Sequence, residues 1–181
     1  MSETIPRALI LVVDAQVGFV NGSNQETVAR IGALLENPAE LGVAFTQYRN
    51  LPGSSYDRFL DWRLLSTDGE CEIVPLLRPK AVRIFRKSGY SALTDELRIL
   101  LESEQIETVY LCGFDTDCCV LTSAAQLFEL GIRPVILEHY CASNGGPESH
   151  AAALHVLQRL IGARHILPGK QNCKELAQRR W

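Results

Sequence analysis

Residues 108–139, TVYLCGFDTDCCVLTSAAQLFELGIRPVILEH, contain an apolar run, a longer amphipathic run and a second apolar run. The two apolar runs, 108–113 and 134–139, lack polar alternation, which is typical of strands that are buried on both faces. The amphipathic segment between them predicts a helix over 118–131. A strand, a helix and a strand in this order favour a parallel crossover unit.

The same alternation extends in both directions along the chain. Further strands are predicted at 8–13, 42–47, 81–87 and 164–167, and further helices at 24–36, 93–103, 147–162 and 170–179. Residues 49–79 are interrupted by proline and glycine and predict irregular structure with one helical turn near 59–65. We therefore expect one domain over residues 1–181, a three-layer α/β/α fold around a six-stranded, mainly parallel, doubly wound sheet.

Composition excludes several classes of protein. The chain has 181 residues, 46% of them hydrophobic, and a formal net charge of −3. Such a composition excludes a disordered chain and disfavours a nucleic-acid binder, which would carry a basic surface. No apolar run approaches the roughly 20 residues that span a bilayer. The first residues lack a basic leader with a cleavage site, so no signal peptide and no membrane partner are expected.

The cysteines indicate the compartment. The chain has six of them, with no framework spacing and no C-x-x-C pair, at positions 71, 112, 118, 119, 141 and 173. A domain of this size has an ample core and does not need disulfides to fold. We therefore expect reduced thiols in a cytoplasmic protein, and the question is whether one of them is reactive.

Ligands of parallel sheets bind beyond the carboxyl ends of the strands, so the residues that follow each strand are the candidates. Asp14 follows the first strand, where partial burial can raise the pKa of a carboxyl toward that of a useful base. The alternative is an aspartate that caps a turn. Lys87 follows the third strand and could hold a carboxylate in place or lower the pKa of a thiol. The alternative is a solvated lysine at a strand end.

Two adjacent cysteines, Cys118 and Cys119, stand at the start of the predicted helix 118–131. Unpaired backbone N–H groups and the positive end of the helix dipole favour a thiolate there and can stabilise an oxyanion. Because neighbouring helical residues point about 100° apart, only one of the two thiols faces the edge of the sheet. The alternative is a pair of small residues that fill the space between helix and sheet. An acid, a cation and a thiol at one edge form a set for nucleophilic catalysis.

Three short motifs follow these strands. They read D-x-Q-x-x-F from Asp14 to Phe19, K-x-x-Y-S-A from Lys87 to Ala92, and G-x-x-T-D-x-C-V from Gly113 to Val120. In this order and at these separations they resemble the isochorismatase-like cysteine hydrolases, over residues 8 to 167. Each motif alone is weak, but the three together are specific.

The resemblance implies a mechanism. Cys119 would be the nucleophile, Asp14 its proton acceptor and Lys87 the group that stabilises the charges. The thiolate would attack an amide or ureido carbonyl and form an acyl-enzyme that water hydrolyses. Relatives commonly have a cis peptide at the position of Phe114–Asp115, which would direct the N–H of Asp115 into an oxyanion hole beside that of Cys119.

The resemblance also implies the surroundings of the site. Phe19 and Tyr90 match positions that line the substrate pocket, and Gln47 could hydrogen-bond a polar substrate. Metal-binding nicotinamidases carry Asp-x-His after the second strand, whereas this chain has Gln47 to Asn50 without a histidine. No metal and no cofactor are therefore expected. Relatives are often dimers or larger, so a homo-oligomer, dimer or tetramer, is expected.

Two features of the chain keep alternatives open. Asp115 stands where many relatives have a small apolar residue, and the loop after the first strand is short. These features favour a non-catalytic member that binds a small molecule or a partner protein. Isochorismatases themselves cleave a vinyl ether and need no cysteine, and a thiol redox sensor would rest on Cys118 and Cys119. The intact set Asp14, Lys87 and Cys119 instead favours hydrolysis of a small amide, ureide or carbamoyl compound.

Overall fold

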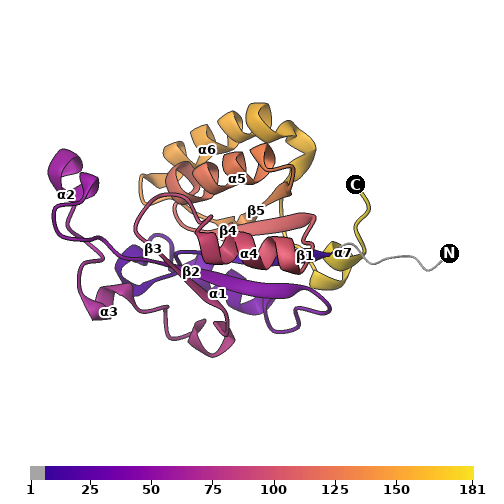
Figure 1. Ribbon diagram of the computed structural model, residues 1–181, viewed down its shortest axis with the longest axis horizontal. Coiled ribbons are helices and arrows are strands. Elements are labelled where there is room, and N and C mark those ends of the chain that lie inside the picture. The colour runs from indigo at the N-terminus through magenta and orange to yellow at the C-terminus, as the bar shows by residue number, and fades with distance from the viewer. Residues whose placement is uncertain (1–6) are drawn as a thin grey trace.

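The computed structural model describes residues 7–181 (Figure 1), so the expectation about the first six residues lies outside it. All strand pairs of the sheet are parallel, and the strand order is β3-β2-β1-β4-β5-β6. The strands are β1 (Ala8–Val13), β2 (Gly42–Tyr48), β3 (Ile84–Lys87), β4 (Thr108–Gly113), β5 (Arg133–Cys141) and β6 (Ile166–Leu167). The predicted doubly wound α/β fold is confirmed, and the order reverses between β1 and β4, where such sheets bind ligands.

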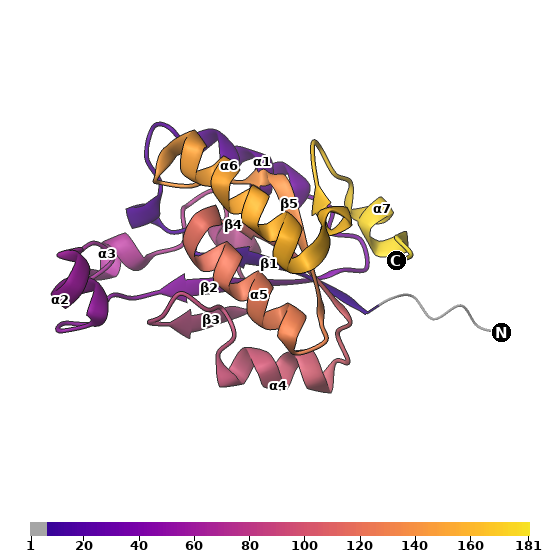
Figure 2. The same cartoon turned by 90° about the horizontal axis from the view of Figure 1, so that it is seen from above.

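Helices cover both faces of the sheet. The face that carries α5 and α6 also carries α4, because right-handed crossovers place all connections from β3 to β6 on one side (Figures 1 and 2). The opposite face carries α1 and α7 (Figure 1). The helices are α1 (Gln25–Leu34), α4 (Asp95–Ser103), α5 (Leu121–Glu129), α6 (Gly146–Leu157) and α7 (Cys173–Gln178). Within residues 7–181 no helix is long and apolar enough to cross a membrane.

The core follows the strands that lack polar alternation. Every residue of β1 and of β4 is buried, as expected of central strands that are covered by helices on both faces. The edge strands β3 and β6 are shorter than predicted. A 3-10 turn at Arg78–Lys80 delays the start of β3 to Ile84, and a second 3-10 turn at Ala163–His165 takes the first residues of the strand predicted at 164–167.

The segment between β2 and β3 contains two short helices that the sequence did not place. Helix α2 (Ser55–Leu60) begins at Ser54, whose side chain accepts a hydrogen bond from the backbone N–H of Asp57. Helix α3 (Asp68–Cys71) begins with a capping box between Thr67 and Glu70. The single turn predicted near 59–65 overlaps only the end of α2, at residues 59 and 60, because the local caps at Ser54 and Thr67 set where the two helices begin. Figure 1 shows α2 at the end of the molecule away from both termini.

Gly113, at the end of β4, sets the path of the chain into the third motif. Its φ is +113°, and a Cβ built at this position would lie 2.1 Å from the backbone oxygen of Val13. An L side chain is strained in this backbone conformation and has no space here. The glycine thus allows β4 to approach the end of β1 closely.

We predict that Gly113→Ala lowers the free energy of unfolding by more than about 3 kcal/mol, because strain and a backbone clash add. Urea denaturation measures this change. Gly131→Ala is the matched control, since Gly131 also has a positive φ (+75°) but a Cβ there would meet nothing within 4 Å. Gly131→Ala should lower the free energy of unfolding by about 1 kcal/mol. Equal decreases in the two variants would contradict the role of the close approach between Gly113 and Val13.

Candidate active site

Asp14 lies directly after β1 and is fully buried. Its φ is +49°, a left-handed conformation that aspartate tolerates better than most residues. Thr46, on β2, accepts a hydrogen bond from the Asp14 backbone N–H at 3.0 Å and donates its hydroxyl to Asp14 Oδ1 at 2.6 Å. Thr46 therefore fixes both the backbone and the carboxylate, and leaves Oδ2 for another partner.

That partner is Lys87, the last residue of β3, whose side chain is 2% exposed. The Nζ atom of Lys87 lies 2.7 Å from Asp14 Oδ2 and donates to the backbone oxygens of Gly89 at 2.9 Å and Tyr90 at 3.1 Å. Burial alone would lower the pKa of Lys87, but the charge of Asp14 and the hydrogen bonds to Asp14 and Cys119 outweigh it and raise that pKa above its ordinary value. Lys87 is therefore a buried cation.

Cys119 completes the group. It lies in a π-helical turn, Thr116–Val120, which precedes α5, and its Sγ accepts a hydrogen bond from Lys87 Nζ at 3.3 Å. Burial raises the pKa of the Cys119 thiol well above its ordinary value, and the charge of Asp14 raises it further against the opposing effect of Lys87. The Cys119 thiol therefore holds its proton more tightly than a free cysteine does, so that a nucleophilic role would require a base.

The adjacent Cys118 has a different environment. It is partly exposed, and burial together with the charges of Asp117 and Asp115 raises the pKa of its thiol to about 11. The structure gives Cys118 no contact with Lys87. Of the two adjacent cysteines, the one that faces Asp14 and Lys87 is Cys119.

Asp115 follows a cis peptide bond between Phe114 and Asp115. Its carboxylate is directed toward the loop after β5, because Oδ1 accepts hydrogen bonds from the backbone N–H of Asn144 at 3.0 Å and from Asn144 Nδ2 at 2.8 Å. Burial raises the pKa of the Asp115 carboxyl to about 6. Within residues 7–181 the backbone N–H of Asp115 has no hydrogen-bond partner, so it is available to a substrate oxyanion.

Asn144 joins three loops through its side chain, and no sequence motif selected it. Its Nδ2 donates to Asp115 and to the backbone oxygen of Phe19, and its Oδ1 accepts from Asn21 at 2.7 Å and Asn24 at 3.1 Å. Asn144 thus links the short loop after β1 to Asp115, the residue that follows the cis peptide. Only the folded chain brings these positions together, since they are more than 100 residues apart.

An aromatic cluster surrounds the Lys87 end of the site. It includes the two expected lining residues Phe19 and Tyr90. The Tyr90 ring packs edge-on against Tyr56 with centroids 4.9 Å apart, and the Phe19 ring stacks on Trp62 at 6.0 Å. Tyr48, on β2, lies with its ring centroid 5.3 Å from Lys87 Nζ. Sequence reasoning missed Tyr56 and Trp62, because the irregular segment 49–79 offered no way to place aromatic residues. It missed Tyr48 because the predicted strand ended at residue 47, one residue before the end of β2.

The structure does not bring Gln47 to this group. Adjacent residues of a strand point to opposite faces, so the neighbouring Tyr48 faces Lys87 and Gln47 faces the α1 side. Gln47 Nε2 donates to the backbone oxygen of Cys71 at 2.8 Å, which is also the acceptor of Gln16 Nε2 at 2.8 Å. Asp14, Lys87 and Cys119 lie together, with Phe19 and Tyr90 in the aromatic cluster beside Lys87, and Asp115 three residues before the π-helical turn's Cys118.

The residues after β2 do not fit a divalent metal. Within the described range no three histidine, cysteine, aspartate or glutamate side chains gather as a ligand set. The Gln47 amide donates to Cys71, and Arg49, two residues further, is a cation paired with Asp68. A metal site needs anionic or neutral donors at this position.

Three comparisons place the chain among known proteins. The model of the family described as the isochorismatase domain matches residues 8–165. The chain is 30% identical over 90 residues to isochorismatase domain-containing protein 2 of Rattus norvegicus; the match spans 48% of this chain and 43% of that protein. The chain thus aligns with less than half of that curated relative.

The solved structures show the same fold. An isochorismatase-like hydrolase from Alkaliphilus metalliredigens superposes with a TM-score of 0.80 at 19% identity, covering 95% of this chain and 98% of that chain. N-carbamoylsarcosine amidase from Thermoplasma acidophilum superposes with a TM-score of 0.77 at 22% identity, covering 93% and 98%.

Asp115 predicts a specific dependence of stability on pH. Its carboxyl binds a proton more tightly in the folded chain, with a pKa of about 6 against an ordinary value of 3.8. The folded state therefore holds more protons between these values, and its stability should fall as the pH rises through about 4 to 6. We expect the free energy of unfolding of the wild type to fall, relative to that of Asp115→Asn, by at most about 3 kcal/mol across this pH range.

Urea denaturation of both proteins at a series of pH values measures the difference. Asparagine is the matched replacement, because its side-chain oxygen can still accept the two hydrogen bonds from Asn144. A difference that is constant from pH 4 to pH 7 would contradict a raised pKa at Asp115.

Proposed function

The chain belongs to the isochorismatase family, and from this premise we propose that it is a cysteine hydrolase that cleaves a C–N bond of a small amide, ureide or carbamoyl compound. One observation carries the proposal: Lys87 Nζ lies 2.7 Å from Asp14 Oδ2 and 3.3 Å from Cys119 Sγ, in a buried site. The similarity in fold to an N-carbamoylsarcosine amidase supports C–N hydrolysis as the reaction.

The buried charges explain how the thiol can be activated. With Asp14 ionised, Lys87 protonated and Cys119 a thiol, the group has no net charge. After the thiol proton moves to Asp14, the thiolate and the ammonium again balance. Because the net charge is unchanged, the transfer does not leave an uncompensated charge in a desolvated site, which would cost several kcal/mol. Lys87 therefore permits a proton transfer that burial would otherwise prevent.

The first half of the reaction forms the acyl-enzyme. As the Cys119 proton moves to Asp14, the sulfur attacks the substrate carbonyl carbon and the carbonyl oxygen becomes an oxyanion. The free N–H of Asp115 donates to that oxyanion, with the N–H of Cys119 as the second donor. When the tetrahedral intermediate collapses, Asp14 returns the proton to the departing nitrogen, which leaves as an amine or ammonia.

The second half restores the enzyme. Asp14, again ionised, removes a proton from a water molecule, and the resulting hydroxide attacks the thioester carbonyl. The C–S bond breaks, the acid product is released, and Asp14 returns the proton to the Cys119 sulfur. The direction of the Asp115 carboxylate toward Asn144 keeps its charge from occupying the oxyanion position.

We predict that Cys119→Ala abolishes this hydrolysis, with a loss of at least about a thousandfold, because the covalent route is closed. The measurement is ammonia release from a panel of primary amides, ureides and N-carbamoyl amino acids. Cys118→Ala is the matched control and should retain most of the activity, since Cys118 does not contact Asp14 or Lys87. Equal activity in the two variants, or no turnover of any compound in the panel by the wild type, would contradict the proposal.

A further inference from the structure

A cavity of about 580 Å³ opens on the other face of the sheet, beside β2 and β3. Its lining is rich in charged residues. The residues that line it are Gln47, Arg49, Leu51, Asp68, Cys71, Glu72, Arg78, Arg86, Lys87 and Ser88. Cys119 and Asp14 are not among them, whereas Lys87 belongs to both, so the cavity adjoins the site described above.

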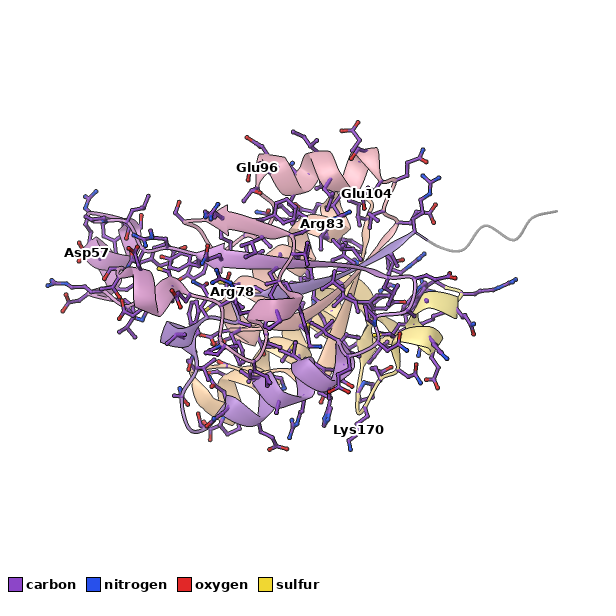
Figure 3. All side chains as sticks on the ribbon, turned by 90° about the horizontal axis from the view of Figure 1, so that it is seen from below. Asp57, Arg78, Arg83, Glu96, Glu104 and Lys170 are labelled. Carbon is purple, nitrogen blue, oxygen red and sulfur yellow. The ribbon has the colours of Figure 1, made fainter. Side chains whose placement is uncertain are left out.

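Strand alternation places the cavity opposite the catalytic group. In the register of β2 and β3, Gln47 pairs with Arg86 and Tyr48 pairs with Lys87. The amine of Lys87 and the ring of Tyr48 face the α4–α5 side, so Gln47 and Arg86 face the α1 side. Figure 3 looks onto the α1 side and labels Arg78 in this region, next to the strands. The amine of Lys87 does not serve this cavity, because it is paired with Asp14.

The cavity contains more positive charge than its own acids neutralise. Arg49 is paired with Asp68. Across residues 7–181 neither Arg78 nor Arg86 forms an ion pair, and both are exposed. Glu72, the other acid of the lining, also forms none. Two guanidinium groups in one concavity thus have no carboxylate bound to them.

We propose that this cavity is a second binding site, which takes a small anion bearing carboxylate or phosphate groups between Arg78 and Arg86. A guanidinium presents paired N–H donors that match two oxygens of a carboxylate or phosphate. Two such groups on one cavity select a ligand with several anionic oxygens over a monovalent ion.

The cavity also borders Cys71, whose backbone oxygen helps to hold the loop after β1. The backbone oxygen of Cys71, a lining residue, accepts hydrogen bonds from both Gln47 and Gln16, each at 2.8 Å. Gln16 lies two residues after Asp14 and also donates to the Tyr48 backbone oxygen at 2.8 Å. A ligand in the cavity would therefore lie beside the segment that holds the loop after β1.

Isothermal titration calorimetry and thermal melting test the site, with inorganic phosphate and succinate as separate probes. The protein is Cys119→Ala, so that the result does not depend on the proposed hydrolase activity. We expect at least one probe to bind and to raise the melting temperature. Adding Arg78→Ala and Arg86→Ala should weaken that binding at least about tenfold, because two charged hydrogen-bonding partners are lost. The phosphate and succinate arms distinguish the two chemical sources of anion.

Arg83→Ala is the matched control, because Arg83 is an exposed arginine next to β3 that pairs instead with Glu104 at 2.7 Å (Figure 3). It should bind the probe as the parent does. Arg86→Lys should retain part of the affinity, since it keeps the charge and loses the paired donors. Absence of binding by both probes in the parent, or equal binding by the parent and the Arg78/Arg86 double variant, would overturn the proposal. Melting of each variant without ligand shows that it is folded.

Discussion

The ion pair between Lys87 and Asp14 is the constraint on which the site depends. Both groups are buried, and removing two charges from water costs several kcal/mol each unless the protein replaces their hydration. The protein does so with Thr46 on the carboxylate and with the backbone oxygens of Gly89 and Tyr90 on the ammonium. The pair joins the ends of β1 and β3 across β2, and Cys119 is added to it from the turn after β4.

The sheet separates two kinds of chemistry because neighbouring strand residues point in opposite directions. At the end of β3, Lys87 belongs to the buried, charge-balanced group, whereas Arg86 belongs to the exposed cavity on the α1 side. At the end of β2, Tyr48 and Gln47 divide in the same way. The pairing of β2 with β3 thus places a buried, charge-balanced group on one face of the sheet and an exposed cationic cavity on the other. Gln16 and Gln47 connect the two faces through a single backbone oxygen, that of Cys71.

The parts of the fold that depend on local pattern were predictable from the sequence. The central strands β1 and β4 have the bounds that their apolar runs predicted, because burial on both faces leaves a continuous apolar signature. The residues after three strands, Asp14, Lys87 and the pair Cys118 and Cys119, were also selected this way, since a parallel sheet gathers its carboxyl ends at one edge. The choice of Cys119 over Cys118 came from the resemblance to the family.

The rest of the site depends on contacts that no short pattern encodes. Thr46 and Asn144 act through hydrogen bonds to residues 32 and 29 positions away, so nothing near them in the chain marks their roles. Residues 49–79 contain two short capped helices, of which only the end of α2 overlaps the turn predicted near 59–65, and the aromatic side chains Tyr56 and Trp62 pack on each other. Gln47 was expected near the substrate, but which face it takes depends on the register of β2 with β3.

Asp14 and Lys87 have opposite effects on the pKa of the Cys119 thiol, and this is the central claim. The pH dependence of Cys119 alkylation by iodoacetamide, followed by peptide mass mapping, tests this claim most directly. Since the charge of Asp14 raises the pKa of the thiol and Lys87 lowers it, Asp14→Asn should move the alkylation midpoint of Cys119 to lower pH. Cys118 in the same samples is the internal control and should not move. A Cys119 midpoint that is unchanged or higher in Asp14→Asn would contradict the account.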